Sequence, residues 1–309
     1  MNQTDRPSGI YPMLYAFFKK NGALDRAAIR AQVKASTANE AHGVAVLGLA
    51  TEVAKLTESE RHQIVEWVSE DLSGKLPLAV TIFGDSIEKQ VDFARHARHC
   101  GADWVILQPP RTGAVGDDEL VPFFGRVMEK LDMPVAVQNA PEYIGIGLSE
   151  DGIAALAKQH SNFTVLKGEG PVLQIRRVIE RNGDRLSVFN GRAGLELIDN
   201  LRAGCAGIIP GAESFDLQAR CFEAMRNGDD VLAYTLYARA LPTIVFVMQS
   251  IDHLVCYGKR IAALRLGIKD VYDRAPGIAP SAFGLECVQH HAALLGPLRC
   301  DITLLTRCC

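Results

Sequence analysis

A single lysine ends an apolar run in the segment NFTVLKGEGP, residues 162–171, and a glutamate follows two positions later. Side chains alternate between the two faces of a β-strand, so Lys167 and Glu169 share a face if this segment is a strand. A lysine that loses its hydration is biased towards the neutral amine, a nucleophile that forms an imine with a ketone or aldehyde. The spacing therefore predicts Lys167 and Glu169 as a catalytic pair.

Two opposite effects act on this lysine, and the sequence leaves their balance open. Burial favours the neutral amine, whereas a carboxylate on the same face favours the charged ammonium. The alternative interpretation is structural: Lys167 would be an ion-paired lysine at a strand edge whose aliphatic stem covers apolar surface.

The elements that must position this pair follow from a repeated pattern between residues 10 and 228. Short apolar runs alternate with amphipathic segments eight times, and the runs are apolar throughout, as is typical of strands buried on both faces of a parallel sheet. The pattern predicts an α/β fold, a (β/α)8 TIM barrel over residues 1–228. The predicted strands are 11–17, 43–49, 76–83, 103–109, 133–139, 163–168, 186–191 and 206–211.

Helices are expected between these strands and after the last one. Residues with a side-chain oxygen that can cap a helix N-terminus precede the amphipathic segments, and TESE at 57–60 has the spacing of a capping box. Residues 229–309 have no further strand pattern, so they are expected to form a helical C-terminal extension packed on the barrel. The predicted capping residues are Asp25, Thr57, Ser86, Asp117 and Ser149.

In barrels of this kind the chemistry lies at the C-terminal ends of the strands. Gln138 and Asn190 are expected there to contact substrate hydroxyls, although the first could merely fill space and the second merely shape a turn. The backbone amides of Ala50 and Thr51 are expected to bind a substrate carboxylate, since successive amides at a loop form an anion site. The polar residues at predicted strand ends are Glu52, Gln108, Gln138, Asn139, Lys167, Glu169 and Asn190.

Composition narrows the class of protein. The 309 residues are 48% hydrophobic, and 33 basic against 36 acidic residues give a net charge of −3. This balance offers no electrostatic basis for binding nucleic acid or an anionic membrane, and no apolar run approaches the roughly 20 residues of a membrane span. A soluble cytoplasmic protein is expected.

No cofactor and no metal are expected. The first predicted strand lacks a following G-x-G-x-x-G, which disfavours dinucleotide binding. The eight histidines show no metal-ligand spacing, and an iminium is itself an electron sink. The eight cysteines do not suggest a disulfide framework, and the role of the Cys308–Cys309 tail is left open.

Blocks spread from about residue 9 to 270 resemble the dihydrodipicolinate synthase and N-acetylneuraminate lyase superfamily of Schiff-base (β/α)8 enzymes. The blocks are GIYPMLYAFF, GVAVLGLATEVAKLTESER, GADWVILQPP, VQNAPEYIGIGLS, VLKGEG and LRAGCAGIIPG. The resemblance implies that Lys167 forms an imine with C2 of a 2-oxo acid. It also implies a homotetramer, with the C-terminal helices contributing to its packing.

The chain departs from the family pattern in its proton relay. The family's G-T-T-G-E is replaced by GLATE at 48–52, and the tyrosine of Tyr-Asn-x-Pro by Gln138, whose amide cannot exchange a full proton at working pH. Pro110-Arg111 replaces a pair of tyrosines, and Tyr143 replaces the arginine that binds a dicarboxylate. These changes argue against synthase and neuraminate lyase activity; Tyr143 could substitute for the lost phenol.

Dehydration is the imine chemistry that these residues favour. An imine at C2 makes the C3 protons acidic, and a C4 hydroxyl can then leave without carbon–carbon cleavage, with Glu169 as acid, base or both. The pattern looks like the 2-keto-3-deoxy-L-arabonate dehydratases of pentose catabolism, such as L-arabinose degradation, which form α-ketoglutarate semialdehyde. Glucarate-pathway dehydratases are a close alternative. A class I aldolase releasing pyruvate and an aldehyde and a catalytically silent 2-oxo-acid-binding protein also stay open.

Overall fold

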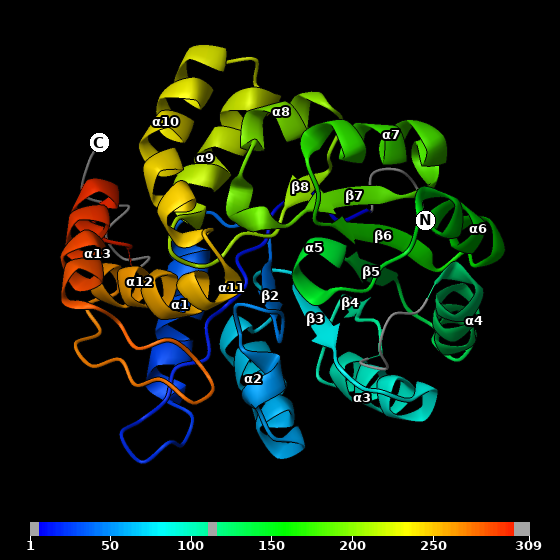
Figure 1. Ribbon diagram of the computed structural model, residues 1–309, viewed down its shortest axis with the longest axis horizontal. Coiled ribbons are helices and arrows are strands. Elements are labelled where there is room, and N and C mark those ends of the chain that lie inside the picture. Colours follow the sequence, from blue (N-terminus) through cyan, green and yellow to red (C-terminus); the bar gives the residue numbers. More distant parts are fainter. Residues whose placement is uncertain (1–5, 111–115, 300–309) are drawn as a thin grey trace.

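The computed structural model describes residues 6–110 and 116–299, and it forms a ring of parallel strands surrounded by helices (Figure 1). The hydrogen-bonded strand order is β1-β8-β7-β6-β5-β4-β3-β2. The strands are β1 (Gly9–Ile10), β2 (Val44–Val46), β3 (Leu78–Ile82), β4 (Trp104–Leu107), β5 (Val135–Asn139), β6 (Phe163–Gly168), β7 (Ser187–Asn190) and β8 (Gly207–Ile208).

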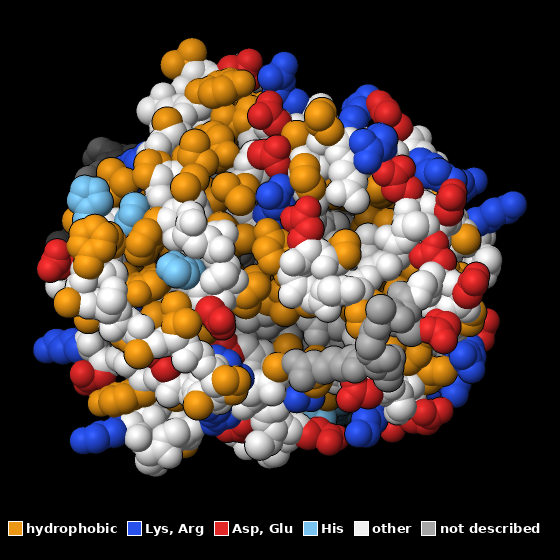
Figure 2. All heavy atoms as spheres, in the orientation of Figure 1, with side chains coloured by type: hydrophobic (Ala, Val, Ile, Leu, Met, Phe, Trp, Pro, Cys, Tyr) orange, Lys and Arg blue, Asp and Glu red, His pale blue; other side chains and the backbone are white. Residues whose placement is uncertain are grey.

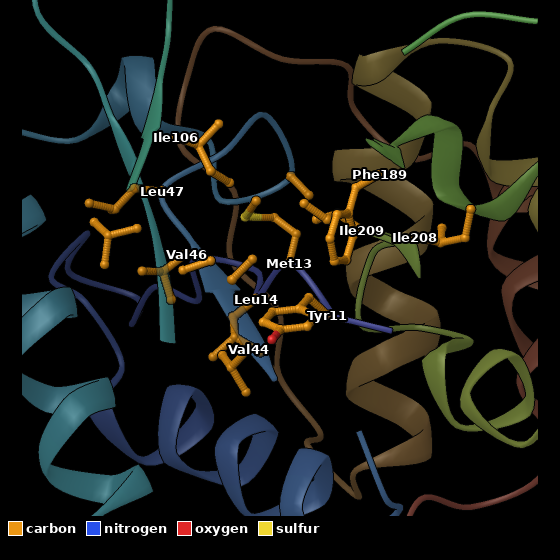
Figure 3. Packing of buried hydrophobic residues seen from close by; sticks show 14 of the residues in the cluster. Tyr11, Met13, Leu14, Val44, Val46, Leu47, Ile106, Phe189, Ile208 and Ile209 are labelled. Atoms are coloured by element: carbon orange, nitrogen blue, oxygen red, sulfur yellow. The ribbon is translucent and has the colours of Figure 1, made fainter. Parts of the chain in front are cut away.

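The segment after β1 closes the barrel. Met13 bridges to Ala45 on one side and to Gly211 on the other, and the Leu14 amide donates to the Ala45 carbonyl at 2.9 Å. Figure 3 shows Met13 and Leu14 between the side chains of β2 and those of β7 and β8. The predicted TIM barrel is confirmed. The first strand, however, is Gly9–Ile10 and precedes the predicted 11–17, although the Tyr11 and Met13 amides still donate to the Ile208 and Pro210 carbonyls.

Helices follow the strands as predicted, and four of the five expected caps hold. Asp25, Ser86 and Ser149 accept hydrogen bonds from backbone amides, and Thr57 forms a complete capping box with Glu60. Asp117 is instead the first residue of its helix, after a Gly116 cap. The helices are α1 (Arg26–Ala38), α2 (Glu58–Leu72), α3 (Ile87–His99), α4 (Asp117–Met128), α5 (Pro141–Ile144), α6 (Glu150–Gln159), α7 (Val172–Asn182), α8 (Leu197–Arg202) and α9 (Phe215–Arg226).

A helical extension follows α9. Ion pairs join it to the barrel, among them Arg265–Asp216 and Arg274–Glu60, each at 2.7 Å. It consists of α10 (Asp230–Val247), α11 (Ile251–His253), a π-helical turn (Leu254–Gly258), α12 (Lys259–Arg265) and α13 (Ala282–Leu295).

Helix α10 has the length and composition of a membrane span, a feature that the sequence analysis did not identify. Length and composition are weak evidence here, because core helices of soluble proteins have the same properties. α10 packs along α9, and a third of it is buried.

Left-handed backbone conformations occur at the C-terminal ends of two strands. Leu47 and Glu52 follow β2 with φ of 64° and 58°, and Arg192, Ala193 and Glu196 follow β7 with φ between 44° and 56°. Such angles are unfavourable for residues other than glycine and persist only where the surrounding structure enforces them. Both segments border the site described next.

Candidate active site

Strand β6 carries Lys167 into the C-terminal end of the barrel. Lys167 pairs in register with Gln138 on β5 and Phe189 on β7. Its Nζ lies 2.8 Å from Oε1 of Glu169, and both side chains are 5% exposed. The structure thus brings together the two residues that the alternation of side chains placed on one face.

Three glutamines connected by hydrogen bonds lead to Glu169. Gln138 donates from Nε2 to Glu169 Oε1 at 2.7 Å and accepts at its own Oε1 from Gln108 Nε2 at 2.8 Å. Gln90 in turn donates to the Gln108 carbonyl at 2.9 Å. Gln138 was expected to contact substrate hydroxyls. In the structure its amide contacts the Glu169 carboxylate and orients it.

The free oxygen of Glu169 gives this pair its chemical possibilities. Oε1 forms the ion pair with Lys167 and accepts the hydrogen bond from Gln138. Oε2 has no hydrogen-bond partner in the part of the chain that the structure describes. Gly191 leaves the space for this carboxylate, since a Cβ at that position would lie 2.6 Å from Glu169 Cδ. Any side chain at residue 191 would displace Glu169.

The pair lines a narrow cavity, and a larger cavity shares part of that cavity's wall. The first is narrow, about 30 Å³, and contains Lys167, Glu169, Gly191 and Arg192 in its wall. The second is larger, about 310 Å³, and Leu49 and Ile251 belong to the walls of both. The larger cavity is otherwise lined by Glu52, Val53, Ala54, Lys55, Phe83, Gln108, Pro109, Pro110, Tyr143, Ile144, Ile146, Asp252 and Val255.

The loop after β2 offers two unbonded backbone amides to the narrow cavity. Within the described residues, neither the Leu49 nor the Ala50 amide has a hydrogen-bond acceptor, and both residues line the cavity wall. Thr51 does not join them: its amide donates to the Gly48 carbonyl at 3.1 Å, and its hydroxyl to the Leu14 carbonyl at 2.6 Å. Of the two amides expected to bind a carboxylate, that of Ala50 is therefore available and that of Thr51 is not, whereas the Leu49 amide is also without an acceptor among the described residues.

Asn190 is tied to the loop after β6. Both hydrogens of its Nδ2 are used, on the Gly170 carbonyl and on Asn200 Oδ1, each at 2.9 Å. The side chain is fully buried and lies in neither cavity wall, while its Oδ1 has no hydrogen-bond partner among the described residues. The expected contact of Asn190 with substrate therefore stays a prediction.

Tyr143 lies on the short helix α5, in the wall of the larger cavity and not of the narrow one. Its Oη is 3.4 Å from Nε of Arg192, a residue that the sequence analysis did not consider. Arg192 lies two residues beyond the end of β7, so the strand-end rule, extended past Gly191, would have found it. Arg111, named in the sequence analysis, lies outside the described residues, as do Cys308 and Cys309.

The face of the molecule drawn in Figure 2 carries basic and acidic side chains intermixed, while hydrophobic side chains gather over α9 and α10. Exposed residues of α10 include Val231, Tyr234 and Val245. No single-sign patch is visible on this face.

A second buried lysine–glutamate pair lies beside the larger cavity. Lys259 Nζ forms an ion pair with Glu52 Oε1, and Lys55 Nζ lies 2.6 Å from Glu52 Oε2. Lys259 is fully buried, and this burial lowers its pKa while the Glu52 carboxylate acts in the opposite direction. Glu52 was expected at this strand end, but its partner 207 residues away was not foreseen.

The fold and this site define a (β/α)8-barrel enzyme with a buried lysine–carboxylate pair at the C-terminal end of its sixth strand. Residues 6–276 match the family model described as dihydrodipicolinate synthetase family, so the chain belongs to that family. The predicted superfamily and the prediction of a lyase are both confirmed.

Several relatives carry informative names. L-2-keto-3-deoxyarabonate dehydratase of Azospirillum brasilense is 28% identical over 79% of this chain and 80% of its own. A probable 2-dehydro-3-deoxy-D-pentonate aldolase of Escherichia coli is 24% identical over 83% of this chain and 88% of its own. The solved 4-hydroxy-tetrahydrodipicolinate synthase of Methylacidiphilum fumariolicum superposes with a TM-score of 0.86 at 19% identity, covering 94% of this chain and 96% of that one.

Proposed function

We propose that the protein dehydrates a 2-keto-3-deoxy sugar acid through an imine on Lys167, with 2-keto-3-deoxy-L-arabonate as the best substrate. The observation that carries the proposal is the Lys167–Glu169 pair, supported by Gln138 at the position where the family pattern has a tyrosine. Similarity to the Azospirillum brasilense dehydratase supports the same reaction.

The geometry suggests a role for each residue. The Leu49 and Ala50 amides would hold the substrate carboxylate, and the C2 carbonyl would face Lys167 Nζ. Glu169 would accept a proton from the ammonium, freeing the amine to attack C2; loss of the carbonyl oxygen as water then gives the iminium. Imine formation thus starts from the ion pair itself.

Elimination follows from the same carboxylate. Glu169 removes a C3 proton, and the electron pair forms an enamine with the iminium as acceptor. The C4–oxygen bond then breaks, and the hydroxyl leaves as water with the proton that Glu169 holds. Proton transfer from C5 to C3 gives the C5 enol and then the aldehyde, and hydrolysis of the imine releases α-ketoglutarate semialdehyde and Lys167.

Aldol cleavage is the second candidate, because the Escherichia coli relative carries an aldolase name. Cleavage between C3 and C4 needs a base on the C4 hydroxyl. Gln138 cannot serve, Tyr143 lines the larger cavity and not the one beside Lys167, and Glu169 is already used on the C3 proton in the proposed reaction. These positions favour dehydration.

The test is incubation of the purified protein with 2-keto-3-deoxy-L-arabonate, with products identified by mass and a parallel sample reduced with borohydride. A semialdehyde and a reduced adduct on Lys167 are expected. Pyruvate as the product would show that the protein is an aldolase and not a dehydratase. An adduct without turnover would indicate a 2-oxo-acid-binding protein.

The remaining expectations are part of the proposal. A cytoplasmic location, a homotetramer, a small-molecule partner and the absence of nucleic-acid or membrane partners stay predictions. Light scattering on the purified protein tests the homotetramer, for which a mass of about four chains of 33.6 kDa is expected.

A further inference from the structure

Arg192 has a backbone conformation that its own local contacts do not explain. It follows Gly191 at the end of β7 with φ of 44°, and Ala193 continues in the same left-handed region with φ of 52°. Two successive residues of this kind are costly, and such costs concentrate at functional sites. Both residues line the narrow cavity beside Lys167.

The guanidinium spans the boundary between the two cavities. Arg192 lines the narrow cavity beside Lys167, and its Nε lies 3.4 Å from Oη of Tyr143, which lines the larger one. The side chain is 18% exposed. A guanidinium has five N–H donors, and only two of them have acceptors among the described residues. Donors therefore remain for a ligand.

The ion pair with Glu196 does not by itself account for this arrangement. Arg192 Nη1 lies 3.1 Å from Glu196 Oε2, and the glutamate side chain is 37% exposed. A partly exposed pair of this spacing stabilises a protein only slightly. Glu196 also accepts from the Val172 amide at 3.3 Å, so it can hold its place without the arginine.

The narrow cavity places Arg192 together with the groups proposed to hold the other end of the substrate. Leu49, Ala50, Lys167 and Arg192 all line it, so with the carboxylate on the Leu49 and Ala50 amides and C2 at Lys167, the guanidinium remains for the distal carbons. Apart from Lys167 and Glu169, Arg192 is the only polar side chain among the described residues that line the narrow cavity, and its Nε lies 3.4 Å from the Tyr143 hydroxyl. An oxygen on the distal carbons would meet them there.

We propose that Arg192, supported by Tyr143, binds an oxygen carried on C5 or beyond and so determines substrate specificity. The substrate class is therefore a 4-hydroxy-2-oxo acid with a distal hydroxyl or carboxylate, in preference to one with an alkyl end. This inference rests on the proposed imine at Lys167.

The experiment compares two substrates that differ only at C5. 2-Keto-3-deoxy-L-arabonate has a C5 hydroxyl, and 4-hydroxy-2-oxopentanoate has a methyl group. Arg192→Met is expected to lower the ratio of their kcat/KM values roughly ten- to hundredfold, as expected for loss of a hydrogen bond from a charged donor. Arg192→Lys, which keeps the charge but loses the planar fork, should lower it less. Tyr143→Phe should lower it least.

Arg202→Met provides the matched control, because Arg202 is an exposed arginine on α8 that lines neither cavity. Its specificity ratio should equal that of the unmodified protein. An unchanged ratio in Arg192→Met would overturn the proposal. Equal losses with both substrates would also overturn it, because they would place the guanidinium on the common carboxylate or in the scaffold.

Imine trapping separates this result from failure of the proposed function. Pyruvate has no carbon beyond C3, so borohydride trapping of pyruvate on Lys167 should occur in Arg192→Met as in the unmodified protein. If the unmodified protein dehydrates neither acid, the proposed function fails. The concentration dependence of adduct formation with the two acids then still measures whether Arg192 recognises the C5 oxygen.

Discussion

The two buried lysine–glutamate pairs at the top of this barrel differ in how fully their atoms are bonded. In the Lys167–Glu169 pair, one carboxylate oxygen is free of hydrogen bonds to the described residues and the pair lines a cavity. In the Lys259–Glu52 pair, each carboxylate oxygen receives an ammonium group. We therefore call Lys167–Glu169, whose proposed role is catalytic, the reactive pair, and Lys259–Glu52, whose carboxylate is fully bonded, the structural pair.

The surroundings of the second pair reinforce this difference. Lys259 is fully buried, lies 5.3 Å from the Phe18 ring centre and has Asp273 at 3.8 Å as a further partner. It begins α12 directly after the π-helical turn Leu254–Gly258, whose first residue, Leu254, lines the narrow cavity. The structural pair therefore adjoins a segment that forms part of the wall of the narrow cavity.

Replacing Lys167 should have the largest effect on function. Lys167→Ala removes the nucleophile, so borohydride trapping should disappear and turnover should fall by about 10⁴-fold or more. Unfolding in urea should change little by comparison, because Glu169 keeps Gln138 and gains access to cavity water. Lys158→Ala, on the outside of α6, is the control. Residual trapping would assign the imine to another lysine.

Replacing Lys259 should have the opposite pattern of effects, a large loss of stability with little change in imine trapping. Lys259→Met leaves Glu52 buried with only Lys55, and loss of one partner from a buried ion pair costs about 3 to 5 kcal/mol of unfolding free energy. Chemical denaturation measures this loss, while pyruvate trapping on Lys167 should persist in the folded fraction.

The double variant Lys259→Met/Glu52→Gln sharpens the interpretation. Removing both charges should recover part of the stability, because no carboxylate is left without its partner. Full loss of trapping with full stability in Lys259→Met would contradict the division between a structural and a reactive pair.

Glu169→Gln tests the reactive pair more finely. The amide can still accept a hydrogen bond from Lys167, and the ammonium can lose its proton to water instead, so imine trapping should survive at a lower rate. The amide cannot carry a proton from C3 to the C4 hydroxyl. Turnover should fall by about 10²- to 10³-fold, the range typical of a lost general acid or base. Unchanged turnover would remove Glu169 from the mechanism.

The smallest effect is expected at a third ion pair, Glu60–Arg274, which also joins the extension to the barrel but is partly exposed. The hydrogen bond from Arg274 lowers the pKa of Glu60 to about 2, from 4.5. Because the folded-state pKa lies below the unfolded one, its contribution is complete above about pH 4.5 and is lost as the pH falls to about 2.

Unfolding measured across that range should therefore be less pH-dependent in Glu60→Gln, by about 2 kcal/mol or less in total. Glu58→Gln, an exposed position in the same first turn of α2, is the control and should keep the original slope. An identical slope in both variants would show that the Glu60–Arg274 pair contributes no stability.

The sequence by itself determined the fold and the reactive pair, because both follow from short-range regularities. Eight continuously apolar runs with capped helices between them specify a parallel barrel, and a two-residue spacing puts Lys167 and Glu169 on one face. Only the first strand was placed wrongly, because regular pairing is confined to Gly9–Ile10, before the apolar run 11–17.

Tertiary structure decided which polar groups meet the reactive pair. The register of β4, β5 and β6 aligns Gln108, Gln138 and Glu169, and the turn after β2 uses the Thr51 amide in a bond to the Gly48 carbonyl while the Leu49 amide has no acceptor among the described residues. The left-handed turn after β7 brings Arg192 to Tyr143, 49 residues earlier in the chain. Periodicity within one strand cannot predict such contacts, because they depend on backbone turns and on the packing of segments distant in sequence.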